Sequence, residues 1–128
     1  MKAWTPYLIA AATLGGCAAY TAHSTPDGLA RARIGQTVHV NGPRVTPIAV
    51  LEDSRCPAEV DCAWPGQVRL SVRVHLGSGS QIRELATGRP IRVADGTLEL
   101  AQVMPLRSSK AAIPPGDYRF AFRFMGGY

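Results

Sequence analysis

The chain has 128 residues, of which 46% are hydrophobic, and it carries 14 basic and 9 acidic side chains for a formal net charge of +5. This length suits one domain and the chain shows no internal repeat, so we expect no second domain. Nearly all of the positive charge is arginine, but no aromatic-basic recognition module accompanies it, which argues against nucleic acid as a partner.

Residues 1–16 have the features of a signal peptide. Met1-Lys2 is a short basic start, and the apolar run after it contains Pro6 and is too short to cross a membrane as a helix. The segment leads into Leu14-Gly15-Gly16-Cys17, which resembles the lipobox of bacterial lipoproteins. In that family the chain is cut before the cysteine, so the resemblance implies that Cys17 is lipidated and becomes the first residue. The alternative is an ordinary signal peptide cut elsewhere, with Cys17 lost or left free.

Residues 17–33 contain no sustained apolar period and predict a flexible tether between the lipid and a domain. Several acyl chains anchor a protein where a single chain would be reversible. Ala18 stands where an aspartate commonly retains bacterial lipoproteins in the inner membrane, so the same resemblance implies the outer membrane, facing the periplasm. Export to such a compartment also removes nucleic acid as a target.

The remaining residues, 34–128, consist of short segments with a period of two. Gln67–Leu76 alternates most clearly, and turn signals recur about every eight to twelve residues. Asn41-Gly42 and Asp95-Gly96 predict hairpin turns, while Pro47 predicts an edge position or a bulge. We therefore predict an all-β fold, a single antiparallel β-sandwich or small barrel of about seven or eight strands.

An aromatic stripe occupies alternate positions of the last predicted strand. It comprises Tyr118, Phe120, Phe122 and Phe124, which alternate with Arg119, Ala121 and Arg123. Alternation with charged residues is typical of a half-buried strand, so we expect this stripe to lie in the core rather than in a ligand site.

Residues 52–66 interrupt the run of strands and contain two of the three cysteines. In an exported protein, Cys56 and Cys62 predict a disulfide that closes a short loop. Such a bridge stabilises by about 2.4 kcal/mol in the chain-entropy model. Trp64 adds a large apolar ring beside the bridge, and Pro65-Gly66 turns the chain into the next strand.

Three other uses of this segment remain open. Its acidic residues could supply some of the oxygens that calcium needs, although no Asp-x-Asp-x-Asp-Gly pattern is present. The acids are Glu52, Asp53, Glu59 and Asp61. A redox pair would need Cys-x-x-Cys spacing at a helix start, and a zinc site would need nearby histidines. We favour a structural disulfide with solvated acids, and we predict neither a metal nor a cofactor.

One motif in this segment resembles small bacterial lipoproteins and exported proteins of unknown function. It runs Asp53-Ser54-Arg55-Cys56-Pro57 and continues with Val60, Cys62, Trp64 and Gly66. That family commonly has Trp-Ala-Gly at the end of this motif, and this chain departs from it with Pro65 in place of the alanine. The family also tends to carry an Ile-x-Pro-x-x-Tyr segment, which Ile113, Pro115 and Tyr118 match here. The resemblance covers most of the chain after residue 34. It implies a fold but no activity, so it identifies no catalytic residues.

Four arginines suggest a possible anion-binding face. Arg69 and Arg73 lie opposite the apolar positions of one strand, and Arg119 and Arg123 lie opposite those of another. If the two strands are neighbours, they form a basic stripe suited to the phosphates or carboxylates of an anionic envelope component. The alternative is an ordinary solvated face.

Catalytic motifs are absent from the sequence, which has neither Gly-x-Ser-x-Gly nor His-Glu-x-x-His. His39 and His75 lie opposite the apolar positions of their strands and are expected to face solvent. Ser54 follows Asp53, but we expect its hydroxyl to cap a turn. Because no set of nucleophile, acid and base comes together, we predict a protein that is not an enzyme.

These observations predict a monomeric, lipid-anchored periplasmic β-domain of the bacterial cell envelope with a binding or structural role. One alternative is an adaptor or inhibitor that binds a protein partner through residues 53–66. Another is a module that binds a divalent cation.

Overall fold

The computed structural model describes residue 3 and residues 28–126. The predicted signal peptide, the lipidation site Cys17 and most of the predicted tether lie outside the described residues. The described elements are β1 (Ala30–Ala32), β2 (Val38–His39), β3 (Arg44–Asp53), β4 (Val68–Leu76), β5 (Gly79–Ala86), β6 (Ile91–Val93), β7 (Gly96–Met104), η1 (Pro115–Asp117) and β8 (Arg119–Gly126). In this part of the chain no helix is long and apolar enough to cross a membrane.

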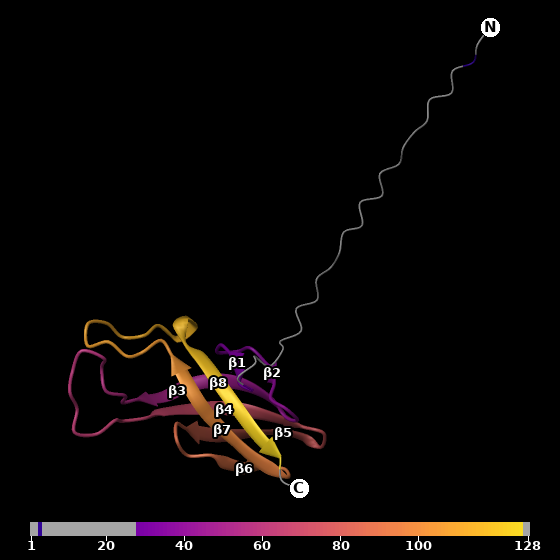
Figure 1. Ribbon diagram of the computed structural model, residues 1–128. Helices are drawn as coiled ribbons and strands as arrows, with labels where there is room; N and C mark the ends of the chain where they lie inside the picture. Colours follow the sequence, from indigo (N-terminus) through magenta and orange to yellow (C-terminus); the bar gives the residue numbers. More distant parts are fainter. Residues whose placement is uncertain (1–2, 4–27, 127–128) are drawn as a thin grey trace.

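The strands form two antiparallel sheets that pack as two layers (Figure 1). One sheet has the order β1-β8-β7-β6 and the other has the order β2-β3-β4-β5. The sheets stay separate and enclose one shared apolar core. This arrangement confirms the predicted antiparallel β-sandwich and its number of strands.

Strands β4, β7 and β8 bury most of their alternate apolar residues in that core, and β8 also buries Ala121, which the alternation had placed with the outward residues. On β4, four apolar residues are at most 1% exposed: Val68, Leu70, Val72 and Val74. The aromatic stripe, which starts at the residue before β8, is buried as predicted, since Tyr118, Phe120, Phe122 and Phe124 all join the same cluster. Because β4 and β8 belong to different sheets that share this core, their polar side chains project from opposite sides of the molecule.

The predicted turn at Asn41-Gly42 and the predicted irregularity at Pro47 are present, whereas the turn predicted at Asp95-Gly96 falls one residue earlier. Val93 pairs with Gly96, so Ala94 and Asp95 form the β6–β7 turn. Val38 pairs with Val45, so the β2–β3 connection falls at Asn41-Gly42. The β3–β4 register shifts between Pro47 and Ala49, which is the predicted irregularity. Strand β2 pairs only with Arg44 and Val45, so Pro47 lies beyond the end of β2. Both readings of Pro47, an edge position and a bulge, therefore fit the structure.

The domain begins earlier than the sequence indicated. Strand β1 pairs with β8, and its Ala30 and Ala32 are 6% and 1% exposed. The predicted tether of residues 17–33 is therefore wrong at its end, because the sheet starts before residue 34. The only apolar residues of β1 are two alanines, so the sequence carries a weak strand pattern there. The two alanines are buried because they pair with Phe122 and Phe120 of β8.

Candidate binding surface

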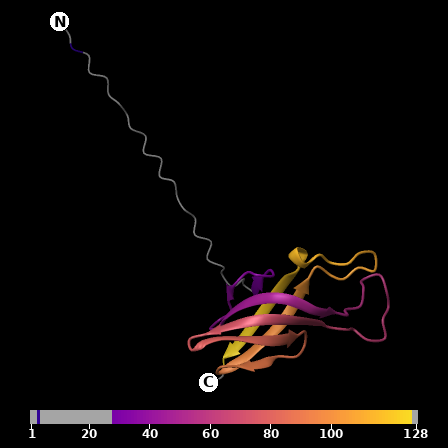
Figure 2. The ribbon, with the colours of Figure 1, turned by 180° about the vertical axis from the view of Figure 1, so that it is seen from behind.

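Two long loops lie side by side at one end of the sandwich. The first loop, residues 54–67, joins β3 to β4, and the second loop, residues 105–118, leads from β7 into β8. Figures 1 and 2 show both loops at the end of the sandwich opposite the end of β8. The Ala58 N–H donates to the carbonyl of Arg107 over 2.9 Å. We refer to the two segments together as the paired loops.

The first loop is closed at its neck by Ser54 and Gln67. The Ser54 N–H donates to the Gln67 carbonyl over 2.9 Å, and the Gln67 N–H donates to Ser54 Oγ over 3.1 Å. Gly66 has φ +67°, and a Cβ there would lie 1.8 Å from the Ser54 carbonyl oxygen. The predicted turn at Gly66 therefore needs glycine, and the Ser54 hydroxyl has a structural role.

The predicted disulfide is present within this loop. It joins Cys56 to Cys62 with a Cα–Cα distance of 5.9 Å. The Pro57 carbonyl accepts a hydrogen bond from Val60 N–H inside the closed ring, and Cys56 N–H donates to the Pro65 carbonyl. Trp64 follows the bridge and is 82% exposed, so its ring lies in solvent and outside the core.

A charged cluster joins this loop to both sheets. Arg55 donates to both carboxylate oxygens of Asp53, from Nε over 2.9 Å and from Nη2 over 2.8 Å. The Tyr118 hydroxyl donates to Asp53 Oδ2 over 2.8 Å, and Arg55 Nη1 donates to the Val103 carbonyl over 2.9 Å. The Arg55 and Asp53 side chains are only 16% and 11% exposed. The Asp53–Arg55–Tyr118 cluster therefore links β3 of one sheet to β7 of the other and to the residue before β8.

The surroundings fix the charges of this cluster. Hydrogen bonds from Arg55 lower the pKa of Asp53, and the same bonds raise the pKa of Arg55. Burial, with the hydrogen bond to Asp53, raises the pKa of Tyr118 to about 12. At neutral pH the cluster is thus a carboxylate held by a guanidinium and a neutral phenol.

Glu59 makes a second link between the paired loops. Its carboxylate accepts hydrogen bonds from the backbone and hydroxyl of Ser109, over 2.9 and 3.1 Å, and from the hydroxyl of Ser108, over 2.8 Å. These bonds, the backbone one first, lower the pKa of Glu59 to about 2.

The other two acids considered for a cation site, Glu52 and Asp61, do not join Asp53 and Glu59. Asp61 is exposed in the first loop, and Glu52 lies on β3. Glu52 accepts a hydrogen bond from Gln67 Nε2 over 3.2 Å and lies 3.9 Å from Arg69 Nη1. Within residues 28–126, no three His, Cys, Asp or Glu side chains come close enough to hold a metal ion.

The predicted basic stripe does not form. Arg69 and Arg73 belong to β4 and Arg119 and Arg123 belong to β8, which lie in different sheets and point to opposite sides. Arg69 is also paired with Glu84 over 2.7 Å, and Arg123 with Glu99 over 3.6 Å. The expectation was wrong because it needed the two strands to be neighbours.

The histidines differ in their surroundings. His39 is exposed, as expected. His75 is half-buried, and its Nε2 lies 2.9 Å from Thr46 Oγ1, so it does not simply face solvent.

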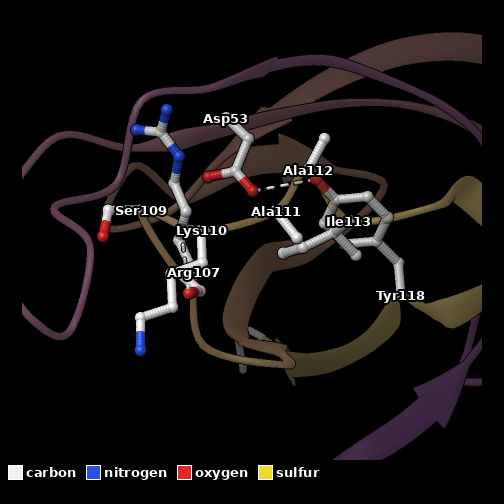
Figure 3. Close-up of a pocket in the computed structure, with 9 residues that line it drawn as sticks. Asp53, Arg107, Ser109, Lys110, Ala111, Ala112, Ile113 and Tyr118 are labelled. Carbon is white, nitrogen blue, oxygen red and sulfur yellow. Dashed lines mark hydrogen bonds between the residues drawn. The ribbon is translucent and has the colours of Figure 1, made fainter.

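A pocket of about 410 Å³ opens against the second loop. It is lined by Asp53, Arg107, Ser108, Ser109, Lys110, Ala111, Ala112, Ile113 and Tyr118 (Figure 3). The sequence indicated no role for Arg107. It placed Tyr118 in the aromatic stripe and, together with Ile113, in the Ile-x-Pro-x-x-Tyr segment. The available signals were this segment and the fact that Tyr118 is the member of the aromatic stripe with a hydroxyl group.

Comparisons with protein-family models, with curated proteins and with solved structures found no match to this chain.

Replacing Asp53 with asparagine tests how much the Asp53–Arg55–Tyr118 cluster contributes to the free energy of unfolding. We expect Asp53→Asn to lower the free energy of unfolding at pH 7 by about 2–3 kcal/mol, because a charged, largely buried hydrogen-bond acceptor is lost. Folding lowers the pKa of Asp53 from 3.8, so its stabilising effect is complete above about pH 4 and disappears as the pH falls through the folded-state pKa.

Urea unfolding between pH 2 and 7, roughly the range over which carboxylates titrate, measures this effect. The difference between the native protein and Asp53→Asn should shrink below about pH 4. Asp95→Asn, in an exposed turn between β6 and β7, is the matched control and should change stability little. A difference for Asp53→Asn that stays constant over the whole pH range would contradict the assignment.

Proposed function

We propose that the protein is a non-enzymatic binding domain of the bacterial cell envelope. In this proposal it is exported, lipidated at Cys17 and held as a monomer at the outer membrane, facing the periplasm. The paired loops are its recognition surface. The lipobox resemblance supports the anchor, and the oxidised Cys56–Cys62 pair fits an exported protein.

The exposed tryptophan on a braced loop carries the binding part of the proposal. A side chain as large as tryptophan is costly to leave in water, and Trp64 is 82% exposed. The disulfide, the Ser54–Gln67 neck and the hydrogen bonds to the second loop restrict the backbone around it. Tryptophan is enriched among residues that dominate binding energy, and a preorganised loop loses less entropy on binding.

These features favour a protein partner over an anionic polymer. The predicted basic stripe would have been the binding face for lipopolysaccharide phosphates or acidic glycans, and its arginines lie on opposite sides of the sandwich. Val60 and Leu106 are also exposed within the paired loops, at 48% and 66%. Exposed apolar side chains of this kind are typical of the centre of a protein interface. An adaptor or inhibitor acting through residues 53–66 is the form of the proposal that this surface supports best.

Replacing the lipidated cysteine tests the anchor. Cys17→Ser should move the protein from the membrane fraction to the soluble periplasmic fraction, because the lipid is its proposed attachment. Fractionation followed by immunoblotting measures this, with Cys62→Ser as a control that leaves residue 17 intact. A Cys17→Ser protein that remains with the membranes would remove the anchor from the proposal.

Replacing the exposed tryptophan tests the recognition surface. In intact cells, crosslinking followed by mass spectrometry should recover a protein partner with the native chain, and Trp64→Ala should reduce its yield about tenfold or more. Ile82→Ala is the matched control, since Ile82 is 53% exposed on β5 outside the paired loops. An unchanged partner yield for Trp64→Ala would exclude this loop as the recognition surface.

A further inference from the structure

The pocket beside the second loop has two chemically different halves. Figure 3 shows Arg107 and Lys110 on one side and the side chains of Ala112, Ile113 and Tyr118 on the other. Its volume of about 410 Å³ lies within the range of small-molecule sites. A ligand that fits both halves therefore needs an anionic group joined to a small apolar body.

Arg107 is the side chain in this pocket with unused binding capacity. It is half-buried, and Nη1 donates to the Arg55 carbonyl over 2.8 Å. Among residues 28–126 no carboxylate forms an ion pair with it. The carboxylate that lines the pocket, Asp53, already accepts hydrogen bonds from Arg55 and Tyr118. The remaining N–H groups of the Arg107 guanidinium have no described acceptor and can bind a ligand.

The local charge favours an anion with a single negative charge. Three cationic side chains, those of Arg55, Arg107 and Lys110, lie in or against the pocket, and they are opposed by the carboxylates of Asp53 and Glu59. This leaves an excess of one positive charge. A carboxylate would neutralise it, whereas a phosphate dianion would be left partly uncompensated beside two carboxylates.

We propose that this pocket binds a carboxylate group carried on a short apolar body. Arg107 binds the carboxylate, Lys110 adds positive charge at the rim, and Ala112, Ile113 and the Tyr118 ring contact the apolar part. The C-terminal carboxylate of a peptide and a free small carboxylic acid share this chemistry. The first source rests on the proposed function, because it would belong to the protein partner of the paired loops.

The test uses the full processed chain in detergent and isothermal titration calorimetry. Acetyl-dialanine is the probe, with acetyl-dialanine amide as its uncharged equivalent, and butyrate and inorganic phosphate as further ligands. We expect acetyl-dialanine to bind at least about tenfold more tightly than the amide and than phosphate, the ratio typical of one charge-assisted contact. Butyrate binding as tightly as acetyl-dialanine would support the carboxylate site and assign it to free acids.

Variants locate the binding in the pocket. Arg107→Gln should weaken acetyl-dialanine binding at least about tenfold, Arg107→Lys should restore part of it, and Ala112→Phe should block the pocket from an exposed position. Arg73→Gln, on the exposed face of β4, is the matched charge control and should bind as the native chain does. Arg107 also donates a hydrogen bond to the Arg55 carbonyl, so Arg107→Gln can unfold the loop. In that case Ala112→Phe, which leaves this hydrogen bond in place, still tests whether the ligand binds in the pocket.

Two results would overturn the proposal. They are the absence of acetyl-dialanine binding at about 10 mM, and equal binding of the acid and its amide. Neither result affects the test of the Trp64-dependent partner, because that test measures the yield of a crosslinked protein in cells and not the binding of acetyl-dialanine. Failure of the pocket and failure of the recognition loop are therefore distinguishable.

Discussion

The bidentate ion pair between Asp53 and Arg55 is the interaction on which the functional end of this molecule depends. Two charges as buried as these are stable only when each is fully hydrogen-bonded, and here the Tyr118 hydroxyl and the Val103 carbonyl complete the set. Its members come from the end of β3, the first loop, β7 and the residue before β8. One polar cluster therefore fixes how the two sheets meet where the loops leave them.

The rest of the loop structure follows from this fixed base. The Ser54–Gln67 hydrogen bonds and Gly66 bring the two ends of the first loop together directly above the cluster. The Cys56–Cys62 bridge then shortens the free chain, and Glu59 bonds its tip to the second loop. Hydrogen bonds at the neck, the disulfide and the Glu59 contacts thus restrict the backbone of the first loop. A loop restricted in this way keeps an apolar ring in solvent and away from the core. This explains how Trp64 stays exposed.

The sequence predicted what local patterns encode and missed what depends on strand order. Alternation over Gln67–Leu76 and over the aromatic stripe predicted the buried faces correctly, because a period of two is a local property. The basic stripe failed because no local pattern states which sheet a strand joins. The contact between Asp53 and Tyr118 spans 65 residues, so the Asp-Ser-Arg-Cys-Pro run and the Ile-x-Pro-x-x-Tyr segment gave no sign that they meet. Strand β1 was missed because its apolar residues are alanines.

The central claim is that the cluster holds the paired loops together as one surface, and amide hydrogen exchange in Tyr118→Phe tests it most directly. This variant removes one hydroxyl group and keeps the buried ring. The account predicts that the amides of Ala58 and Ser109, which bond across the loops, exchange about tenfold faster, while the amides of β4 keep their protection. Unchanged exchange at Ala58 and Ser109 would show that the loops hold together without the cluster and would contradict the account.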